Sequence, residues 1–352
     1  MNNSAARIIV VCCIVLAGFS ALTLNSCRDK TITQWDTLVV HDTIHCPDSA
    51  LWVSRSTNTT EDLVIGAFKG GAGFVGGTHG VMLQTNDAGN TWQSASSAPV
   101  FNSSYGPGAV YGLSFADSLS LFAAGDQRMI VQSMDGGQSW NSMNTLAVPT
   151  TDLIRSIRFV TSGIGFIGTS DAYAAPSGSI CKTTDGGQSW IPTFTTHGGI
   201  YNIDFLGSNG VAQGRFGVNY WTNDNGTSWN PGSSDVPNAV IYRSAFTNPS
   251  TAFAVAMENE SLGYILKSTD GGHNWHTIKS VPFGLQGISF NGNNTVTAVG
   301  YGGIVYESTD GGSTWNQEKA GNYRWIDIRY INSTRAIVVG QNGRIYTRDL
   351  QH

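Results

Sequence analysis

The string STDGGHNW at residues 268–275 recurs along the chain with small variations. Further copies read TNDAGNTW (85–92), SMDGGQSW (133–140), TTDGGQSW (183–190), TNDNGTSW (222–229) and STDGGSTW (308–315). Each copy has Ser or Thr at its start, Asp at its third position, Gly at its fifth and Trp at its end. The copies begin 39 to 50 residues apart. A recurrence of this length indicates stacked supersecondary units rather than one irregular domain.

One such unit runs from Ala109 to Met143. It contains three short apolar or alternating runs, the eight-residue motif, and a fourth run that opens with Trp140. This order predicts four antiparallel strands, with the motif as the turn between the third and fourth. In that turn Asp135 is expected to accept backbone N–H bonds and Gly137 to take a positive φ, while Trp140 packs across the turn.

The repeated motif carries an aspartate and a tryptophan in every copy. These residues are Asp87, Trp92, Asp135, Trp140, Asp185, Trp190, Asp224, Trp229, Asp270, Trp275, Asp310 and Trp315. A ring of carboxylates suggests metal binding or acid–base chemistry at first sight. However, a residue that recurs at the same turn of every unit lies far from its copies, so we interpret all twelve as structural.

The number of units comes from the first and third strands. Seven similar runs, each ending on Phe or Tyr, occur at 63–68, 110–115, 154–159, 200–205, 241–246, 285–290 and 325–330. The last unit stops after Thr347-Arg348-Asp349 and lacks an outer strand, whereas the Trp-led run LWVSR (51–55) has no unit of its own. Because ring closure removes exposed sheet edges, the sequence predicts an all-β, seven-bladed propeller closed by the strand near Trp52. The run WDTLVV (35–40) is a rival closing strand.

The first 27 residues have the pattern of a bacterial lipoprotein signal. Arg7 precedes a run of 17 largely apolar residues that ends at Leu24. This run is shorter than a membrane-spanning helix, which needs about 20 residues. Leu24-Asn25-Ser26-Cys27 resembles a lipobox, which makes Cys27 the predicted lipidation site and residues 28–50 a flexible tether. Ordinary cleaved secretion and an uncleaved anchor are the alternatives. Arg28 after the cysteine favours the outer membrane over other envelope locations.

Composition narrows the possible partners. The net charge is −5 and no run of Lys or Arg occurs, which argues against nucleic-acid binding. Apart from the lipidation site Cys27, only Cys46 and Cys181 remain after signal removal. We expect neither a structural disulfide nor a Cys/His metal site. We expect no cofactor, no metal and a monomer.

The motif identifies a family resemblance. It resembles the Asp-box, or bacterial neuraminidase repeat, and with 40–50 residues per unit and DGGxSW variants the stretch 51–352 looks most like the photosystem II assembly/stability factor family. That resemblance implies a propeller that binds a protein and assists assembly. The motif is specific for the fold and weakly specific for function, because propellers of unrelated activity carry it.

The functional face should lie opposite the motif turns. Long loops are expected there at Gln93–Gly108, Thr169–Gly178 and Met257–Gly263. Tyr and Arg are favoured at interfaces, and several fall near the starts of the first strands. The predicted partner-binding surface at the channel mouth comprises Tyr111, Arg155, Tyr201, Tyr242, Arg243, Gln286 and Arg324.

Two enzyme alternatives draw on the same region. A sialidase needs three converging arginines, a Tyr nucleophile and acidic partners, which Arg155, Arg243, Arg324, the mouth tyrosines and Asp204 could supply, although the usual Arg-Ile-Pro stretch is absent. A two-carboxylate glycosidase could use Glu258 and Glu260. The leading hypothesis is a non-catalytic, lipid-anchored scaffold or assembly factor of the bacterial cell envelope, binding a protein or peptide that could be a membrane protein. A purely structural envelope protein is a third class.

Overall fold

The computed structural model describes residues 7–11, 14–18, 52–95, 102–103, 106–143, 152–171 and 177–350. The chain divides into two units, Met1–Leu51 and Trp52–His352. In the first unit, β1 (Arg7–Val11) and β2 (Ile14–Gly18) pair as an antiparallel hairpin. Cys27 and the predicted tether lie outside the described residues.

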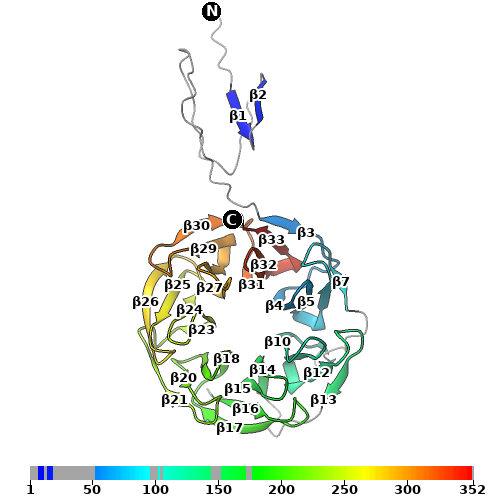
Figure 1. The fold of residues 1–352 in the computed structure, drawn as a ribbon, viewed down its shortest axis with the longest axis vertical. Coiled ribbons are helices and arrows are strands. Elements are labelled where there is room, and N and C mark those ends of the chain that lie inside the picture. The colour runs from blue at the N-terminus through cyan, green and yellow to red at the C-terminus, as the bar shows by residue number, and fades with distance from the viewer. Residues whose placement is uncertain are drawn as a thin grey trace, which may run out of the picture. The chain divides into compact units, whose positions relative to one another are not determined.

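The second unit contains seven antiparallel sheets arranged around a centre (Figure 1). Blade 1 comprises β4 (Leu63–Lys69), β5 (Ala72–Gly77), β6 (Met82–Thr85) and β7 (Gln93–Ser94). Blade 2 comprises β10 (Val110–Phe115), β11 (Leu121–Gly125), β12 (Ile130–Ser133) and β13 (Asn141–Met143). Blade 3 comprises β14 (Asp152–Phe159), β15 (Gly165–Asp171), β16 (Gly178–Thr183) and β17 (Ile191–Thr196).

The remaining blades follow the same order. Blade 4 comprises β18 (Ile200–Leu206), β19 (Asn209–Gly214), β20 (Asn219–Thr222) and β21 (Asn230–Pro231). Blade 5 comprises β23 (Val240–Phe246), β24 (Ala252–Asn259), β25 (Leu262–Ser268) and β26 (Asn274–Val281), and blade 6 comprises β27 (Leu285–Phe290), β28 (Val296–Gly300), β29 (Ile304–Ser308) and β30 (Asn316–Lys319). Blade 7 comprises β31 (Trp325–Asn332), β32 (Arg335–Gly340), β33 (Ile345–Asp349) and β3 (Val53–Arg55). The predicted seven-bladed propeller is confirmed.

Blade 7 is completed by a strand from the other end of the chain. β3 lies beside β33 (Figure 1) and pairs with it antiparallel, with Val53 opposite Thr347. The Arg55 Nε donates a hydrogen bond of 2.8 Å to the Thr347 hydroxyl. The run around Trp52 is therefore the closing strand, as predicted, and it occupies the outer position that the rival segment 35–40 would need.

A buried charge cluster holds this seam together. The Arg348 guanidinium, on a residue only 3% exposed, binds the carboxylates of Glu307 and Glu318 in blade 6. The same guanidinium lies 4.9 Å from the ring centroid of Trp52, and the Trp52 indole N–H donates to Glu318 at 3.3 Å. One arginine thus joins the closing segment to two neighbouring blades; we call these four residues the seam cluster.

The repeated motifs form the turns between third and fourth strands, as predicted. In blade 2 the Asp135 carboxylate accepts bonds from the Ser139 backbone N–H at 2.8 Å and from the Ser133 hydroxyl at 2.8 Å. Gly137 has φ +89°, and its Cα lies so close to Phe74 of blade 1 that a Cβ would meet the ring at 2.1 Å. The Trp140 indole N–H donates to the Gly137 carbonyl at 3.2 Å. Each motif therefore closes its own turn and packs against the preceding blade.

Backbone hydrogen bonds assign the loops to two faces. Links from second to third strands bond to the residue preceding an inner strand, as in Arg215 N–H to Gly199 O (3.1 Å) and Gln341 N–H to Arg324 O (2.9 Å). Motif turns instead bond to the hairpins between first and second strands, as in Ala88 N–H to Gly71 O. The starts of the inner strands therefore lie on the face opposite the motif turns, which we call the mouth face.

Four of the links on the mouth face are single 3₁₀ turns: η1 (Thr78–Gly80), η2 (Asp126–Arg128), η3 (Tyr301–Gly303) and η4 (Gln341–Gly343).

Three details differ from the sequence prediction. Met257–Gly263 is mostly a hairpin extension rather than a loop, since β24 and β25 keep pairing as far as Asn259 and Leu262. In addition, β22 (Ser233–Ser234) pairs in parallel with β26 and gives blade 5 a fifth strand. A short hairpin of β8 (Asn102–Ser103) and β9 (Gly106–Pro107) lies within the predicted loop Gln93–Gly108.

Candidate functional site: the channel mouth

Every inner strand has a β-bulge within its first four residues. In each blade the pairing register between the first two strands shifts there across one residue, which has no partner opposite it. The bulge residues are Val64, Tyr111, Arg155, Tyr201, Tyr242, Gln286 and Ile326. A bulge changes the direction of a side chain without ending the strand. Because each blade contributes one such residue, we call the seven together the bulge ring.

The polar members of the bulge ring contact one another across blades. The Arg155 guanidinium lies 4.3 Å from the Tyr111 ring centroid and 5.2 Å from that of Tyr201. Tyr201 in turn meets Tyr242 edge to face, with centroids 5.7 Å apart. Blades 2 to 5 therefore present a continuous arc of three tyrosines and one arginine, held by cation–π and edge-to-face contacts.

Arg324 extends this arc through blades 6 and 7. It immediately precedes β31, and its Nε donates to the Gln286 side-chain oxygen at 2.7 Å. Its guanidinium also lies 4.8 Å from the ring centroid of Tyr301. Tyr301 was not among the sequence-predicted residues, although its place in the short GYGG link was the available signal. The Tyr–Arg arc is hereafter Tyr111, Arg155, Tyr201, Tyr242, Gln286, Tyr301 and Arg324.

Two of the predicted residues are largely buried: Gln286 is 4% exposed, and Arg243 lies beneath the arc. Arg243 differs from the others in its position on the strand. It follows the bulge residue Tyr242 and returns to normal pairing opposite Val255, so its side chain is only 12% exposed. Its Nη1 donates to the carbonyls of Tyr201 (3.0 Å) and Tyr242 (2.9 Å), and its Nε lies 3.9 Å from buried Asp327. Burial lowers the pKa of Arg243 to about 10, so it stays charged at neutral pH. Arg243 supports the arc from beneath.

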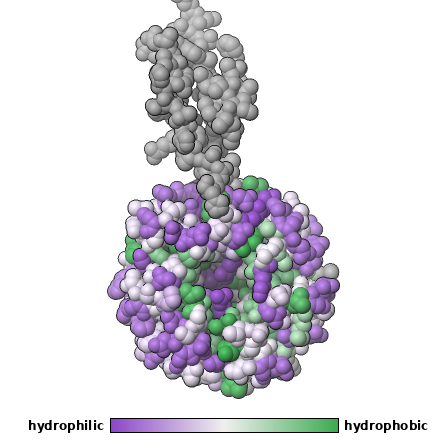
Figure 2. Space-filling view, in the orientation of Figure 1, coloured by the Kyte–Doolittle hydropathy of each residue, from purple (hydrophilic) through white to green (hydrophobic). Residues whose placement is uncertain are grey.

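The channel below the mouth has an excess of positive charge. A cavity of about 400 Å³ is lined by residues of six inner strands, and Figure 2 shows the hollow at the centre of the blades. Its cationic lining residues are Lys69, Arg155, Arg158, Arg243 and Arg329. Opposing them are Asp204 and, bonded to the Arg329 Nε at 2.9 Å, Asp327. A chain of net charge −5 thus concentrates cations at its axis.

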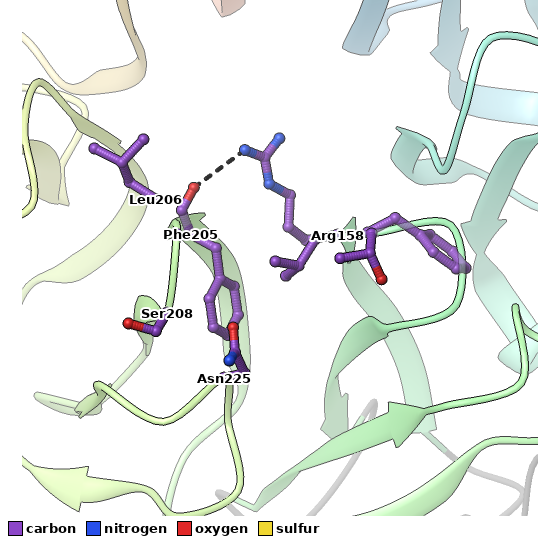
Figure 3. Close-up of a pocket in the computed structure, with 9 residues that line it drawn as sticks. Arg158, Phe205, Leu206, Ser208 and Asn225 are labelled. Carbon is purple, nitrogen blue, oxygen red and sulfur yellow. Dashed lines mark hydrogen bonds between the residues drawn. The ribbon is translucent and has the colours of Figure 1, made fainter.

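A second hollow of about 440 Å³ opens between blades 3 and 4 at the far ends of the inner strands. In Figure 3 the Arg158 side chain reaches across it toward the Phe205 carbonyl, which accepts a bond of 3.3 Å from Nη2. The same guanidinium group lies 3.4 Å from Asp204. Burial raises the pKa of Asp204, and the nearby Arg158 opposes that rise. Arg158 is therefore occupied by groups of the protein itself.

Three tyrosines of the arc carry partly buried hydroxyl groups. Burial raises the pKa of Tyr111, Tyr242 and Tyr301 above the usual value near 10. All three hydroxyls therefore stay protonated at neutral pH. Protonated phenols beside fixed guanidinium groups suit recognition of carboxylates, carbonyls and ring edges.

The groups that a glycosidase would use have other partners. Arg155 packs on two tyrosine rings, Arg243 bonds to backbone carbonyls and Arg324 bonds to Gln286. Glu258 accepts a bond of 2.9 Å from the Tyr264 hydroxyl. Among the described residues, no group of three His, Cys, Asp or Glu side chains is placed to hold a metal ion. The same residues include no helix that could span a membrane.

Comparison with known proteins gives a family resemblance. A family model described as "DUF6242 beta propeller domain" matches residues 210–328. The photosystem II assembly lipoprotein Ycf48 of Synechococcus sp. (strain CC9902) is 35% identical over 132 residues, which are 36% of this chain and 38% of that protein. The chain resembles the photosystem II assembly-factor propellers.

Solved structures agree on the fold. A structure of YCF48 bound to D1 peptide superposes with a TM-score of 0.67 at 21% identity, covering 87% of this chain and 98% of that one. YCF48 from Cyanidioschyzon merolae gives 0.65 at 19% identity, over 85% and 99% of the two chains. A GH74 xyloglucanase from Xanthomonas campestris gives 0.64 at 14% identity, but this chain covers only 54% of it. At these identities the structural likeness concerns the fold alone.

Proposed function

We propose that this chain is a lipid-anchored propeller of the bacterial cell envelope that binds a protein or peptide at the channel mouth and acts as a scaffold or assembly factor, without catalysis. The observation that carries the proposal is the Tyr–Arg arc, which bulges in successive blades place on one face. Aromatic and arginine side chains gathered in this way are typical of binding hot spots.

The chemistry of the arc favours an acidic partner segment. Arg155 lines a channel with an excess of positive charge and Arg324 lies at the start of an inner strand beside Gln286, whereas the chain as a whole is acidic. A local field of this kind attracts carboxylates. Neutral tyrosine hydroxyls between the arginines add donors for backbone carbonyls. The structure of the similar protein YCF48 bound to D1 peptide supports a peptide as the partner.

Chemical crosslinking in cells, followed by affinity purification of the tagged full chain and mass spectrometry, tests the proposal. We expect a specific partner to be recovered with the native chain and lost with the double variant Arg155→Glu, Arg324→Glu. Lys319→Glu is the matched control, because Lys319 is an exposed cation on the outer strand of blade 6. Equal recovery with the double variant would refute binding at the arc.

Two further assays address the anchor and the enzyme alternative. Metabolic labelling with an alkyne fatty acid should modify the native chain and leave Cys27→Ser unlabelled. Incubation with a panel of sialylated and neutral glycans should give no hydrolysis. Turnover that disappears on Asp204→Asn or Glu260→Gln would replace the scaffold proposal with a glycoside hydrolase.

A further inference from the structure

The link between β19 and β20 departs from its counterparts in one residue. Equivalent tight links place a residue with positive φ at their centre, namely His79 (50°), Gln127 (55°), Gly302 (68°) and Asn342 (57°). In blade 4 this position is Phe216, with φ 58°. Glycine, asparagine and histidine tolerate that backbone conformation, whereas a bulky apolar side chain in it is an outlier.

The same phenylalanine is also exposed to solvent. Its relative exposure is 52%, and it is the only phenylalanine among the exposed large hydrophobic residues in the described part of the chain. The Arg215 guanidinium lies 5.0 Å from its ring centroid and covers one side. Neither backbone preference nor core packing explains a phenylalanine here. A residue that is unfavourable on both counts is a candidate for function.

Backbone contacts place Phe216 beside the Tyr–Arg arc. The Arg215 N–H donates to the Gly199 carbonyl at 3.1 Å, two residues before the bulge residue Tyr201. On the other side, Gly217 packs so that a Cβ would lie 3.0 Å from the Pro237 carbonyl oxygen. The link is therefore clamped between the starts of blades 4 and 5, and its aromatic ring stands on the mouth face.

This inference rests on the proposed function. We propose that Phe216, together with Arg215, is an apolar anchor of the same interface. The partner is then an acidic segment with an aliphatic or aromatic side chain that packs on Phe216. Charge complementarity selects this occupant. Arg215, Arg155 and Arg324 contribute positive charge on the mouth face, and Phe216 adds an exposed ring without a hydroxyl group. Exposed aromatic rings flanked by arginine are the residue types that dominate binding energy at protein interfaces.

The test uses three fluorescein-labelled synthetic peptides of equal length. The first contains Glu and Asp around a central Leu, the second replaces that Leu with Ser, and the third replaces every acid of the first with Lys. Fluorescence anisotropy measures their binding to the native chain and to Phe216→Asn, whose side chain suits a positive φ. Leu206→Asn is the matched control, since Leu206 is 39% exposed at the opposite end of its blade.

We expect the native chain to bind the acidic Leu peptide best and the Lys peptide least. Phe216→Asn should weaken binding of the Leu peptide about tenfold, as one lost hot-spot contact does, and leave the Ser peptide unchanged. Leu206→Asn should change neither. Urea unfolding of Phe216→Asn should show stability equal to or above the native value, which excludes a folding defect.

The outcomes separate this inference from the proposed function. If Arg155→Glu, Arg324→Glu abolishes binding but Phe216→Asn affects the Leu and Ser peptides equally, the anchor is refuted and the arc stands. If none of the peptides binds, or if the Lys peptide binds best, both proposals are refuted. If Phe216→Asn destabilises the fold, Phe216 serves the structure and the anchor is again refuted.

Discussion

Replacement of Arg348 by methionine should weaken the closed ring more than any exposed substitution. The guanidinium is nearly buried and neutralises the carboxylates of Glu307 and Glu318. Its removal leaves two acids side by side, and burial already raises the pKa of Glu318. Breaking a buried pair costs roughly 3–5 kcal/mol. Because the two Glu side chains are 19% and 29% exposed, water relieves part of this, and we expect a loss of about 2–4 kcal/mol.

Equilibrium unfolding in urea, followed by tryptophan fluorescence and far-ultraviolet circular dichroism, measures this loss without adding salt that would screen the charges. Arg344→Met is the control, since Arg344 is an exposed arginine of the same blade and should change stability by less than about 0.5 kcal/mol. The triple variant Arg348→Met, Glu307→Gln, Glu318→Gln should recover most of the loss because no unpaired charge remains. A single variant as stable as the native chain, or a triple variant no better than the single, would refute the reasoning.

Three further predictions concern the blades and their closure. Trp275→Ala should cost about 3–5 kcal/mol and Asp270→Asn only about 1 kcal/mol in urea unfolding, because Trp275 is fully buried whereas Asp270 closes a surface turn; the reverse ranking would contradict this. Hydrogen bonds, above all the one from the Ser139 side chain, lower the pKa of Asp135 to about 2 from its usual value of 3.8. Similar bonds do the same in three other motifs. Stability from these carboxylates should therefore hold above about pH 4 and fall between about pH 4 and 2, and Asp135→Asn should make the acid transition less steep; unchanged steepness would argue against it. Removal of residues 1–51 should leave thermal unfolding unchanged, whereas removal of residues 1–55 should lower the midpoint and promote association through the opened edge of blade 7, as light scattering would detect.

The fold followed from sequence because a single local motif repeats. Asp135 and its counterparts indicate turns, and Trp140 and its counterparts indicate the packing of a blade on its neighbour. The unmatched run at 51–55 indicates that the ring is closed by the N-terminal strand. Each of these signals depends on a few neighbouring residues. The seam cluster gave no such signal, since Arg348, Glu307 and Trp52 become neighbours only when the ring closes.

The mouth was predictable in part. Tyr111, Arg155 and Tyr201 each lie near the start of a first strand, which predicted that they share the channel mouth. The structure brings them into contact. Arg243 was misjudged as a surface residue, because the bulge at Tyr242 shifts every later residue of β23 by one position. A bulge is a feature of the backbone, and residues as different as Val64 and Gln286 occupy the bulged position. Residue type therefore does not predict where a bulge occurs.

The bulges also separate recognition from architecture. A bulge residue has no partner opposite it, so the inter-strand hydrogen bonds of each blade continue on either side whatever side chain stands there. Exchange of the seven side chains should therefore alter the mouth surface while strand pairing keeps the shape of the propeller, and neighbouring positions such as Arg155 and Tyr201 should be exchanged together because they are in contact. A library randomised at these positions alone would sample new ligand preferences on a constant scaffold.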